Sequence, residues 1–591
     1  MDQIPRPAPG LTSTATQLRS DAWLASTTVS GLLHRTSVRA GTGIRPGRGR
    51  PVVGICNSWS ELVHCNVHMR ALAESVRRGV LEAGGLPVEF PTISLSENLL
   101  KPTAMFLRNL MAMDVEETLR AHPLDSVVLI GGCDKTVPAQ LMGAISANVP
   151  AITLTGGPSE VAHFQGRELG VGTDLWRYTA ELRAGRMPRA AYDELEDALV
   201  PSHGHCNEMG TASTMAAVCE ALGVALPGSA LVPAVNRRRA DLAAEAGREA
   251  VRLGQSAGGL HDLLTIDHLE NAITVLMALG GSTNAVVHIT ALAGRLGVDL
   301  PLDRFAEISA RTPLIVNVRP SGRHLANDLF NAGGIPAVLH ELRDLLHLNA
   351  MMVTGRHLGD LDLPETTNRD VISTVRDPFG PVGSIAVVRG NLAPRGAIIK
   401  ASAASAHLLR HTGPAIVFDS VQDIADRIDD PALPVTADCV LVLRNSGPVG
   451  GPGMPEWGML PIPARLLASG VNDMVRLSDA RMSGTAFGTV VLHVTPESAV
   501  GGPLAVVRDG DLVTLDVSAG VLRLELSAGE IAQRLDDRPA PLPRYQRGYG
   551  RLFSEHVLQA DAGCDFDFLL DVDNEDRSSP PGLFSGWVGG W

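Results

Sequence analysis

Three of the seven cysteines lie in polar loops, and their side chains are the first candidates for chemistry. Cys65, Cys133 and Cys206 each stand next to the end of an expected strand or the start of an expected helix. Thiolates are the ligands that zinc and iron–sulfur clusters prefer. The wide spacing of these three excludes the local patterns of zinc fingers and ferredoxins. On spacing alone, scattered loop cysteines that bind nothing are the simpler interpretation.

The other four cysteines have no such setting. Cys56, Cys219 and Cys439 lie inside apolar runs, where a cysteine is most simply a small core residue. Cys564 lies in an acidic stretch near the C-terminus and receives no role. Uneven spacing in a long chain does not indicate a disulfide framework, so we expect reduced thiols that are free to bind a metal.

Carboxylates in loops offer a second kind of site. Glu97, Asp134 and Glu456 carry oxygen ligands of the kind that suits Mg²⁺, although each one alone is as easily a solvated carboxylate or a helix cap. Ser483 lies in a Gly-flanked turn without an obvious His–Asp partner in the sequence, so a catalytic triad cannot be argued for it. Taken alone, Ser483 is a turn or cap serine.

A βαβ unit must position the row Cys133-Asp134-Lys135. Residues 126–130 are apolar and β-branched, which is typical of a buried strand. Pro138, with Thr136 as a cap, can sit in the first turn of a helix, and residues 151–155 fit the next strand. The row then lies at the carboxyl end of the first strand, where open α/β sheets bind their ligands.

Strands and helices alternate through residues 51–370, which predicts an α/β domain with a largely parallel sheet. Further strands are expected at 51–56 and 88–90, and helices at 67–83, 104–121, 214–222 and through most of 236–296. Residues 159–200 are charged and expected to be helical. Residues 1–50 are rich in Arg and Gly and predict an N-terminal arm with at most one short helix, around 22–33.

Near residue 370 the pattern changes to short β-rich segments separated by Gly and Pro. These segments are 371–388 and the stretches near 397–400, 415–418, 439–443, 489–494, 504–507 and 512–525. They predict a mostly β, barrel-like domain over residues 371–570, which carries the loops of Glu456 and Ser483. Residues 571–591 are acidic and then rich in Gly, Pro and Trp, which predicts a loosely ordered tail.

Composition narrows the class of protein. A chain of 591 residues is too long for one core, and 45% hydrophobic with 19% charged residues is ordinary for a globular protein. The net charge of −14 argues against a nucleic-acid partner or an anionic membrane surface. No apolar run approaches the length of a transmembrane helix, and the first residues lack the apolar core of a secretory signal. We therefore expect a cytoplasmic protein.

Five long motifs occur in order along the chain. They are SELVHCN at 60–66, GCDKTVP at 132–138, GHCNEMGTA at 204–212, GGPGMPE at 450–456 and SDARMSG at 478–484. Together they resemble the dihydroxy-acid dehydratase / phosphogluconate dehydratase family, and more closely its sugar-acid (aldonate) branch, such as arabinonate and xylonate dehydratases. The resemblance runs from about residue 20 to residue 570.

The resemblance implies a role for each candidate residue. A [2Fe–2S] cluster would be held by Cys65, Cys133 and Cys206, Mg²⁺ by Glu97, Asp134, Glu456 and a carbamylated Lys135, and the base would be Ser483. Carbamylation is physically sensible, because Mg²⁺ repels an ammonium but binds the anionic oxygens of a carbamate. The implied fold is an α/β domain plus a β-barrel-like domain with the site between them. The implied assembly is a homodimer or homotetramer whose N-terminal arm can reach a partner's site.

The implied reaction removes water from a 2,3-dihydroxy sugar acid and gives a 2-keto-3-deoxy acid. Mg²⁺ would hold the substrate carboxylate and 2-hydroxyl, Ser483 would remove the C2 proton, and the open iron would act as a Lewis acid on the 3-hydroxyl. The enol would then tautomerise, and the cluster would transfer no electrons.

The expected substrate is a pentonate or hexonate rather than the branched dihydroxy acid of valine and isoleucine synthesis. The arm sequence at 31–36 resembles the sugar-acid branch, and Glu97 stands where the amino-acid branch has an Asp-Gly pair. His34 and Arg35 could bind substrate hydroxyls in a partner subunit, or they could only anchor the arm.

Three alternatives stay open at this point. One is a dihydroxy-acid dehydratase of branched-chain amino-acid synthesis, which needs the same metal motifs. Another is an enzyme that holds catalytic Zn²⁺ with the same cysteines, which analysis for iron and acid-labile sulfide would exclude. The third is a sugar-acid-binding or scaffolding protein without activity. In such a protein we would expect one of the three loop cysteines or Ser483 to be replaced by another residue, and all four are present here.

Overall fold

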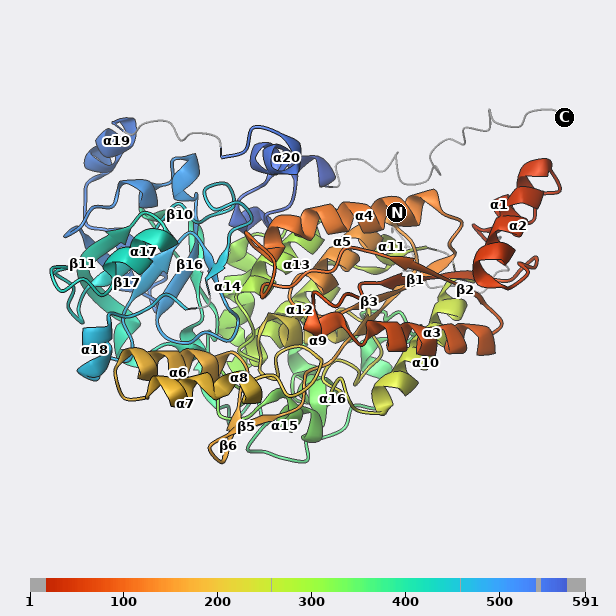
Figure 1. The fold of residues 1–591 in the computed structure, drawn as a ribbon, viewed down its shortest axis with the longest axis horizontal. Coiled ribbons are helices and arrows are strands. Elements are labelled where there is room, and N and C mark those ends of the chain that lie inside the picture. Colours follow the sequence, from red (N-terminus) through yellow and green to blue (C-terminus); the bar gives the residue numbers. More distant parts are fainter. Residues whose placement is uncertain (1–17, 257, 458, 538–543, 571–591) are drawn as a thin grey trace, which may run out of the picture.

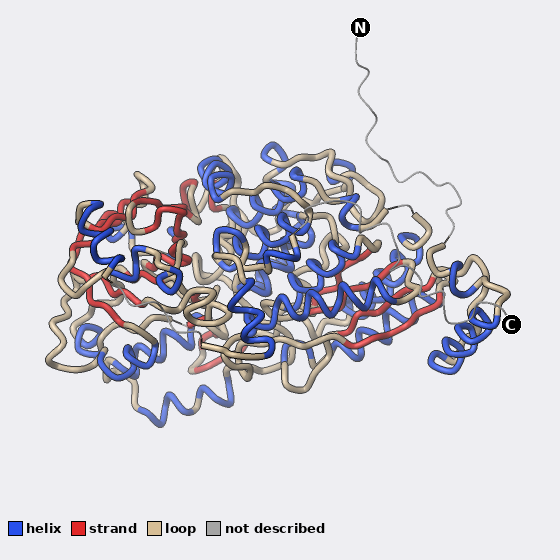
Figure 2. Tube along the Cα trace, turned by 90° about the horizontal axis from the view of Figure 1, so that it is seen from above, coloured by secondary structure: helices blue, strands red, loops and turns tan. Residues whose placement is uncertain are grey.

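The structure is a computed structural model that describes residues 18–256, 258–457, 459–537 and 544–570. A β-barrel lies at one end of the molecule, a parallel sheet with its helices fills the other half, and the arm helices α1 (Asp21–Leu24) and α2 (Val29–Thr42) lie at the far end (Figure 1). Figure 2 shows the same division from above, with helices between the two sets of strands. The expected tail at 571–591 and the first 17 residues of the arm lie outside the described residues.

Four parallel strands form the sheet of the first half, in the order β2-β1-β3-β4. Their bounds are β1 Val52–Asn57, β2 Leu86–Pro91, β3 Ser126–Gly131 and β4 Ala151–Thr155. Every residue of β1, β3 and β4 is buried, as continuous apolar strands of a parallel sheet require. The helices α4 (Arg108–Ala121) and α5 (Thr136–Ala147) lie on one face, and α3 (Met69–Glu82) and α10 (Arg238–Leu253) lie on the other (Figure 1).

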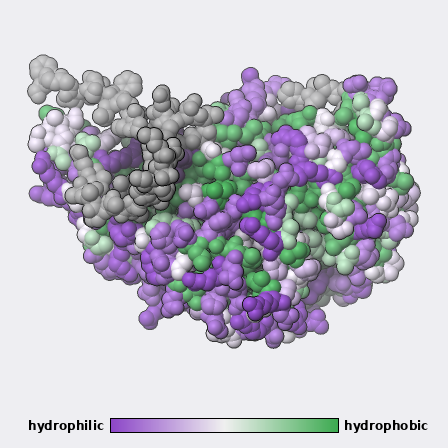
Figure 3. Space-filling view, turned by 180° about the vertical axis from the view of Figure 1, so that it is seen from behind, coloured by the Kyte–Doolittle hydropathy of each residue, from purple (hydrophilic) through white to green (hydrophobic). Residues whose placement is uncertain are grey.

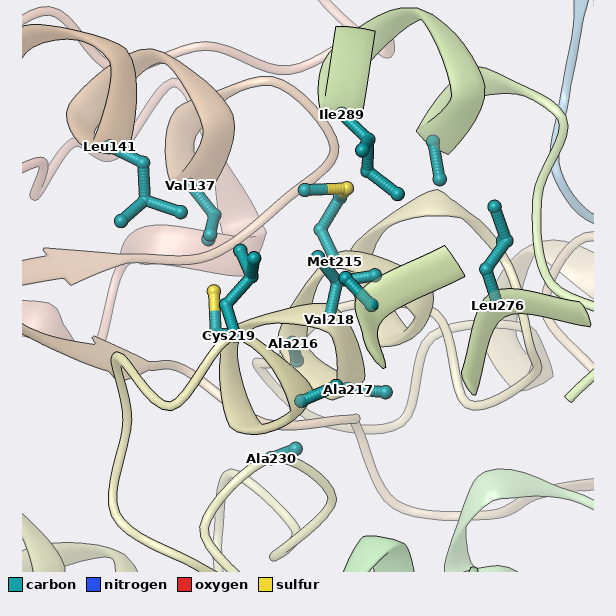
Figure 4. Packing of buried hydrophobic residues seen from close by; sticks show 14 of the residues in the cluster. Val137, Leu141, Met215, Ala216, Ala217, Val218, Cys219, Ala230, Leu276 and Ile289 are labelled. Atoms are coloured by element: carbon teal, nitrogen blue, oxygen red, sulfur yellow. The ribbon is translucent and has the colours of Figure 1, made fainter. Parts of the chain in front are cut away.

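A group of buried helices packs between the sheet and the barrel. These are α9 (Thr211–Ala221), α12 (Ile266–Ala278) and α13 (Asn284–Arg295), and all residues of α9 are buried. Figure 4 shows Val137 and Leu141 of α5 close to Val218 and Cys219 of α9, with Ile289 of α13 nearby. Cys219 is therefore a core residue, as its apolar neighbours predict.

Eight strands close into the barrel of the second half, in the order β10-β16-β14-β12-β11-β17-β18-β9. Their bounds are β9 Ala386–Gly390, β10 Ala393–Ile399, β11 Arg410–Phe418, β12 Val440–Leu443, β14 Arg476–Ser478, β16 Val490–Thr495, β17 Leu512–Asp516 and β18 Val521–Leu524. Buried aliphatic side chains such as Val388, Val442 and Leu477 form one cluster within it, so the barrel is packed rather than hollow. The prediction of an α/β half and a β-barrel half is confirmed.

Several expected segments differ from the structure. Residues 504–507 do not form a strand: Pro503–Val506 is a 3₁₀ helix, which Pro503 can begin because it lacks an N–H to donate. Residues 159–200 contain the short strands β5 (Ala162–Phe164) and β6 (Arg167–Leu169) before the helices α6 (Thr173–Arg183), α7 (Arg189–Asp193) and α8 (Leu195–Ala198). Gln165 and Gly166 between the two strands both have positive φ, which suits a tight hairpin turn.

The segment expected to be β-rich from residue 371 also begins later. Its first strand is β8 (Gly380–Val382), which pairs with β7 (Pro313–Leu314) and not with the barrel. In the arm, the helix α2 continues to Thr42, well beyond the expected residue 33. No helix among the described residues is both long enough and apolar enough to cross a membrane, and the face in Figure 3 mixes hydrophilic and hydrophobic residues.

Candidate active site

A lysine surrounded by three carboxylates forms the centre of the candidate site. The ammonium of Lys135 lies 2.9 Å from Oε2 of Glu456, 3.3 Å from Oε1 of Glu97 and 3.4 Å from Oδ2 of Asp134. The Lys135 side chain is completely buried. The four residues for which the family resemblance implies a magnesium site therefore lie together in the structure.

Both halves of the chain contribute to this cluster. Asp134 and Lys135 follow the carboxyl end of β3 and precede α5, where the βαβ unit predicts them. Glu456 comes from β13 (Glu456–Trp457), which pairs in parallel with β15 (Arg481–Met482). The register places Glu456 beside Arg481, so this short two-stranded sheet delivers a carboxylate and a guanidinium to the cluster.

The charges of the cluster shift one another's pKa values. Burial lowers the pKa of Lys135, and the guanidinium of Arg481 lowers it further, but the three carboxylates outweigh both and raise it above its usual value. Burial would raise the pKa of Glu97, yet Lys135 and Arg481 hold it at about 2. The cluster therefore contains charged groups that compensate one another in a space shielded from water.

Two of the three loop cysteines pack together beside this cluster, and the third, Cys206, is close enough to act on Cys65 electrostatically. Cys65 lies in the 3₁₀ turn His64–Asn66, Cys133 lies between β3 and α5, and Cys206 lies in the loop before α9. Cys65 and Cys133 pack together with Val63 in one small buried group. The loops touch closely at Gly132, where a Cβ would come within 2.9 Å of Asn66 Oδ1 and 3.1 Å of the Cys65 carbonyl.

The cysteines influence one another as closely spaced thiols do. The hydrogen bond with Cys133 and then burial raise the pKa of the Cys65 thiol, and Cys206 adds to the effect. Burial also raises the pKa of Cys206. Cys133 has a φ of 66°, in the left-handed region, which costs a non-glycine residue free energy and is commonest at functional sites.

Within the described residues, no group of three His, Cys, Asp or Glu side chains is arranged to hold a metal ion as it stands. The carboxylates instead surround the ammonium of Lys135, which serves as their counter-ion. The cysteines are free thiols.

Ser483 lies in the turn that follows β15, directly after Arg481 and Met482. Its hydroxyl is 2.8 Å from that of Thr485, and it accepts a weaker hydrogen bond from the Thr485 N–H at 3.3 Å. A Cβ on Gly484 would come within 2.7 Å of the Thr211 nitrogen, so this turn lies tightly against the start of α9. The Ser483 turn therefore lies against the start of α9, which follows the Cys206 loop. In the sequence, Ser483 stands two positions after Arg481, whose guanidinium bonds to Glu456 and Glu97.

Three residues of the site received no role from the sequence. Arg481 donates to Oε2 of Glu456 at 2.9 Å and to Oε1 of Glu97 at 3.2 Å. Thr103 donates to Oε2 of Glu97 at 2.8 Å, and Asn284 donates to Oε2 of Glu456 at 3.0 Å. Arg481 lies within the SDARMSG motif at 478–484, so the sequence did contain a reason to consider it. Thr103 lies directly before a 3₁₀ helix and Asn284 begins α13, and no motif of the sequence analysis includes either residue.

The remaining candidates lie elsewhere. Cys56 is buried in β1 and accepts a hydrogen bond from Gln140, and Cys564 packs against Met454. His34 and Arg35 both bond within the arm, to the carbonyls of Trp23 and Leu24. Within one chain they anchor the arm, at the opposite end of the molecule from the barrel (Figure 1).

Comparison with known families accounts for nearly the whole chain. A family model described as dihydroxy-acid/6-phosphogluconate dehydratase N-terminal matches residues 50–361. The corresponding C-terminal model matches residues 370–564. The first match contains the three loop cysteines, Glu97 and Lys135, and the second contains Glu456 and Ser483.

Similar curated proteins are named either as sugar-acid dehydratases or as dihydroxy-acid dehydratases. A 6-deoxy-6-sulfo-D-gluconate dehydratase of Pseudomonas putida is 46% identical, over 94% of this chain and 96% of that protein. An L-arabonate dehydratase of Azospirillum brasilense is 48% identical, over 95% of this chain and 98% of that protein. A dihydroxy-acid dehydratase of Moorella thermoacetica is 39% identical, over 93% of this chain and all of that protein. The chain therefore belongs to the dihydroxy-acid/6-phosphogluconate dehydratase family and is a dehydratase.

Proposed function

We propose that this dehydratase removes water from a 2,3-dihydroxy sugar acid (an aldonate) and forms the 2-keto-3-deoxy acid. The observation that carries the proposal is the buried cluster of Lys135 with Glu97, Asp134 and Glu456, next to the Ser483 turn. The similar proteins named as sugar-acid dehydratases at 46–48% identity support the aldonate over the branched dihydroxy acid. Dihydroxy-acid dehydratases at 38–39% identity keep the branched acid as the alternative to be tested.

The residues present fit the two cofactors of the proposal. Cys65, Cys133 and Cys206 would hold a [2Fe–2S] cluster: Cys65 and Cys133 pack together in one buried group, and Cys206 is close enough to raise the pKa of Cys65 electrostatically. Mg²⁺ would be held by Glu97, Asp134, Glu456 and a carbamylated Lys135. Carbamylation turns the positive centre of the cluster into an anion, and four anions so close together need a cation among them. When bound, the two groups would supply Lewis-acid activation of the substrate's carboxylate and hydroxyls.

The chain's own residues would move the protons. Deprotonated Ser483 would take the proton from C2 and pass it to the departing 3-hydroxyl, so that water leaves and an enol forms that tautomerises to the 2-keto acid. Thr485 fixes the Ser483 hydroxyl through their 2.8 Å hydrogen bond. Arg481 and Asn284 hold the Glu456 carboxylate in place, and burial keeps bulk water away from the anions.

Substrate choice gives the first test. We expect kcat/KM for at least one pentonate or hexonate to exceed that for 2,3-dihydroxyisovalerate, because a site built for hydroxyl groups rejects an aliphatic analogue that leaves its polar groups unpaired. The measurement is formation of 2-keto acid from a panel of aldonates by anaerobically purified, iron-loaded enzyme. A preference for the branched acid would overturn the substrate and leave the family assignment intact.

Carbamylation of Lys135 is expected to be directly visible. Enzyme prepared with ¹³C-bicarbonate and Mg²⁺ should show one carbamate carbon signal by NMR, and Lys135→Arg should lack it because a guanidinium does not form this adduct. Lys101→Arg is the matched control, since Lys101 is exposed and should leave the signal unchanged. A signal that survives Lys135→Arg would place the carbamate on another amine.

We also propose a homodimer or homotetramer that works in the cytoplasm. The described cysteines are all free, which suits a reducing compartment. Exposed apolar side chains on α2, among them Leu32 and Leu33, favour burial of the arm against a second copy.

A further inference from the structure

Lys400 is a buried cation that the proposed mechanism has not used. It directly follows β10 of the barrel, and only 8% of its surface is exposed. Its ammonium donates a hydrogen bond of 3.3 Å to the carbonyl of Gly484, in the turn that carries Ser483. Among the described residues, no carboxylate comes within ion-pair distance of it. A buried charge without such a partner costs free energy, so its presence requires a reason.

The choice of lysine is itself informative in this chain. Of the fifty Lys and Arg residues, three are lysines: Lys101, Lys135 and Lys400. Lys101 is exposed, Lys135 is at the centre of the carboxylate cluster, and Lys400 lies behind the Ser483 turn. Arginine keeps its charge at all relevant pH values, whereas the compact ammonium of lysine can lose its proton when buried. A chain that otherwise uses arginine thus has its two buried lysines in or beside the candidate site.

Lys400 and Ser483 line the same small cavity. Its volume is about 20 Å³, and its walls also include Thr283, Met482, Phe487 and Leu492. That volume holds about one water molecule. Because most of the walls are apolar, the charge of Lys400 acts on Ser483 with little screening by solvent.

Other charges around Lys400 are few. Glu208 acts on it from the Cys206 loop, although its carboxylate accepts hydrogen bonds from the Gly172 and Thr173 N–H groups instead. Arg476 and Asp473 form an ion pair that packs directly against Gly488, and Gly488 is part of the wall of the same cavity. Burial lowers the pKa of Lys400 to about 7, and Glu208 offsets part of this effect. Deprotonation of Ser483 would place a negative charge near Lys400 and raise the pKa of Lys400 again. Lys400 and Ser483 would therefore titrate as a coupled pair.

We propose that Lys400 is a positioning residue for Ser483: its ammonium holds the Ser483 turn through the Gly484 carbonyl and favours the deprotonated serine. This inference rests on the proposed role of Ser483 as the base. Lys400 forms and breaks no bond of the substrate.

The pH dependence of kcat/KM separates this role from a structural one. Lys400→Gln removes the charge but can still donate a hydrogen bond to Gly484, and Lys400→Met removes both. In both variants we expect the rising limb of the profile to move up by about one pH unit or more, with partial recovery at high pH. Lys400→Arg keeps the charge and should keep the limb near its wild-type position. An equal loss at every pH, with the limb unmoved, would overturn the proposal.

Thermal stability supplies a second readout. The folded-state pKa of Lys400 lies below the usual 10.5, so the unfolded chain binds this proton more tightly. The charge therefore destabilises the fold fully below about pH 7, and the penalty disappears as pH rises towards 10.5. Lys400→Met should accordingly have a Tm equal to or above wild type at pH 6, with a smaller difference at pH 9. A large fall in Tm at pH 6 would show that Lys400 serves the fold instead.

A third measurement needs no turnover. Labelling with lysine enriched in ¹³C at Cε gives three lysine signals, and Lys400→Arg identifies the relevant one. We expect this signal to titrate near pH 7 and to shift its midpoint in Ser483→Ala, because the two groups are coupled. An unchanged midpoint in Ser483→Ala would overturn the proposal. If the wild type dehydrates no aldonate, the proposed function fails, while this titration still tests the coupling of Lys400 with Ser483.

Discussion

Ser483→Ala is expected to keep its iron, sulfide and Mg²⁺ and to lose turnover. A positioned base contributes about 10²–10⁴-fold to the rate, and the loss should reach this range or exceed it if no other group can take the C2 proton. The Ser483 hydroxyl bonds to Thr485 and to no metal-site carboxylate among the described residues, so its removal should leave the ligands in place. The measurements are kcat with the best aldonate and the visible spectrum of the purified variant.

A matched serine provides the control for this result. Ser469 is exposed and donates only to the Leu466 carbonyl in the described structure, so Ser469→Ala should behave as wild type. Exchange of the C2 proton of the substrate with deuterium from solvent adds a direct readout of the base, and it should disappear with Ser483. Turnover of Ser483→Ala within a few-fold of wild type would place the base elsewhere.

The second large effect is expected at Cys65. Cys65→Ser should abolish the visible absorbance and lower iron and acid-labile sulfide to background, because one of three thiolate ligands is lost. Cys56→Ser should keep the absorbance, since Cys56 lies in the core of β1 and bonds to Gln140. Both cysteines are buried and only nine residues apart in sequence, so the pair controls for burial and for handling during purification.

Two results would contradict the assignment of the cysteines. Loss of absorbance in Cys56→Ser with retention in Cys65→Ser would reverse it. Stoichiometric zinc without sulfide in the wild type would replace the cluster by the zinc alternative.

The sheet could be predicted because its strands carry their own signal. Residues 126–130 form a continuous apolar run between turns, and the structure has β3 there with every residue buried. The position of Lys135 followed from the βαβ unit alone. Local propensity gave the wrong prediction in two places. It predicted a strand near Pro503–Val506, but the proline begins a 3₁₀ helix there although apolar residues follow it. It predicted helix where β5 and β6 form a hairpin, because strands of three residues are too short to give a clear pattern.

The contacts of the site depend on partners that no local pattern reveals. Arg481 bonds to Glu97, which lies 384 positions earlier in the chain, and Lys400 meets the Gly484 carbonyl across 84 positions. Neither pairing has a periodicity or a motif spacing of its own. The cofactors and the roles of Ser483 and of the cysteines stay predictions, since a resemblance supplies them and experiment has to test them.

The division of the lysine cluster between the two halves has a consequence for biosynthesis. Lys135 and Glu456 are 321 positions apart, so at about 5–20 residues per second the ribosome needs roughly 16–64 s to deliver the second after the first. The three cysteines have all emerged long before that moment, because Cys206 precedes Glu456 by most of the same interval. Under the proposed ligand assignment, a nascent chain can thus present all three cysteines to the cellular iron–sulfur delivery machinery before its proposed magnesium site is complete. Loading of the two proposed cofactors would then be separable in time, and a ribosome stalled before residue 456 should trap the first without the second.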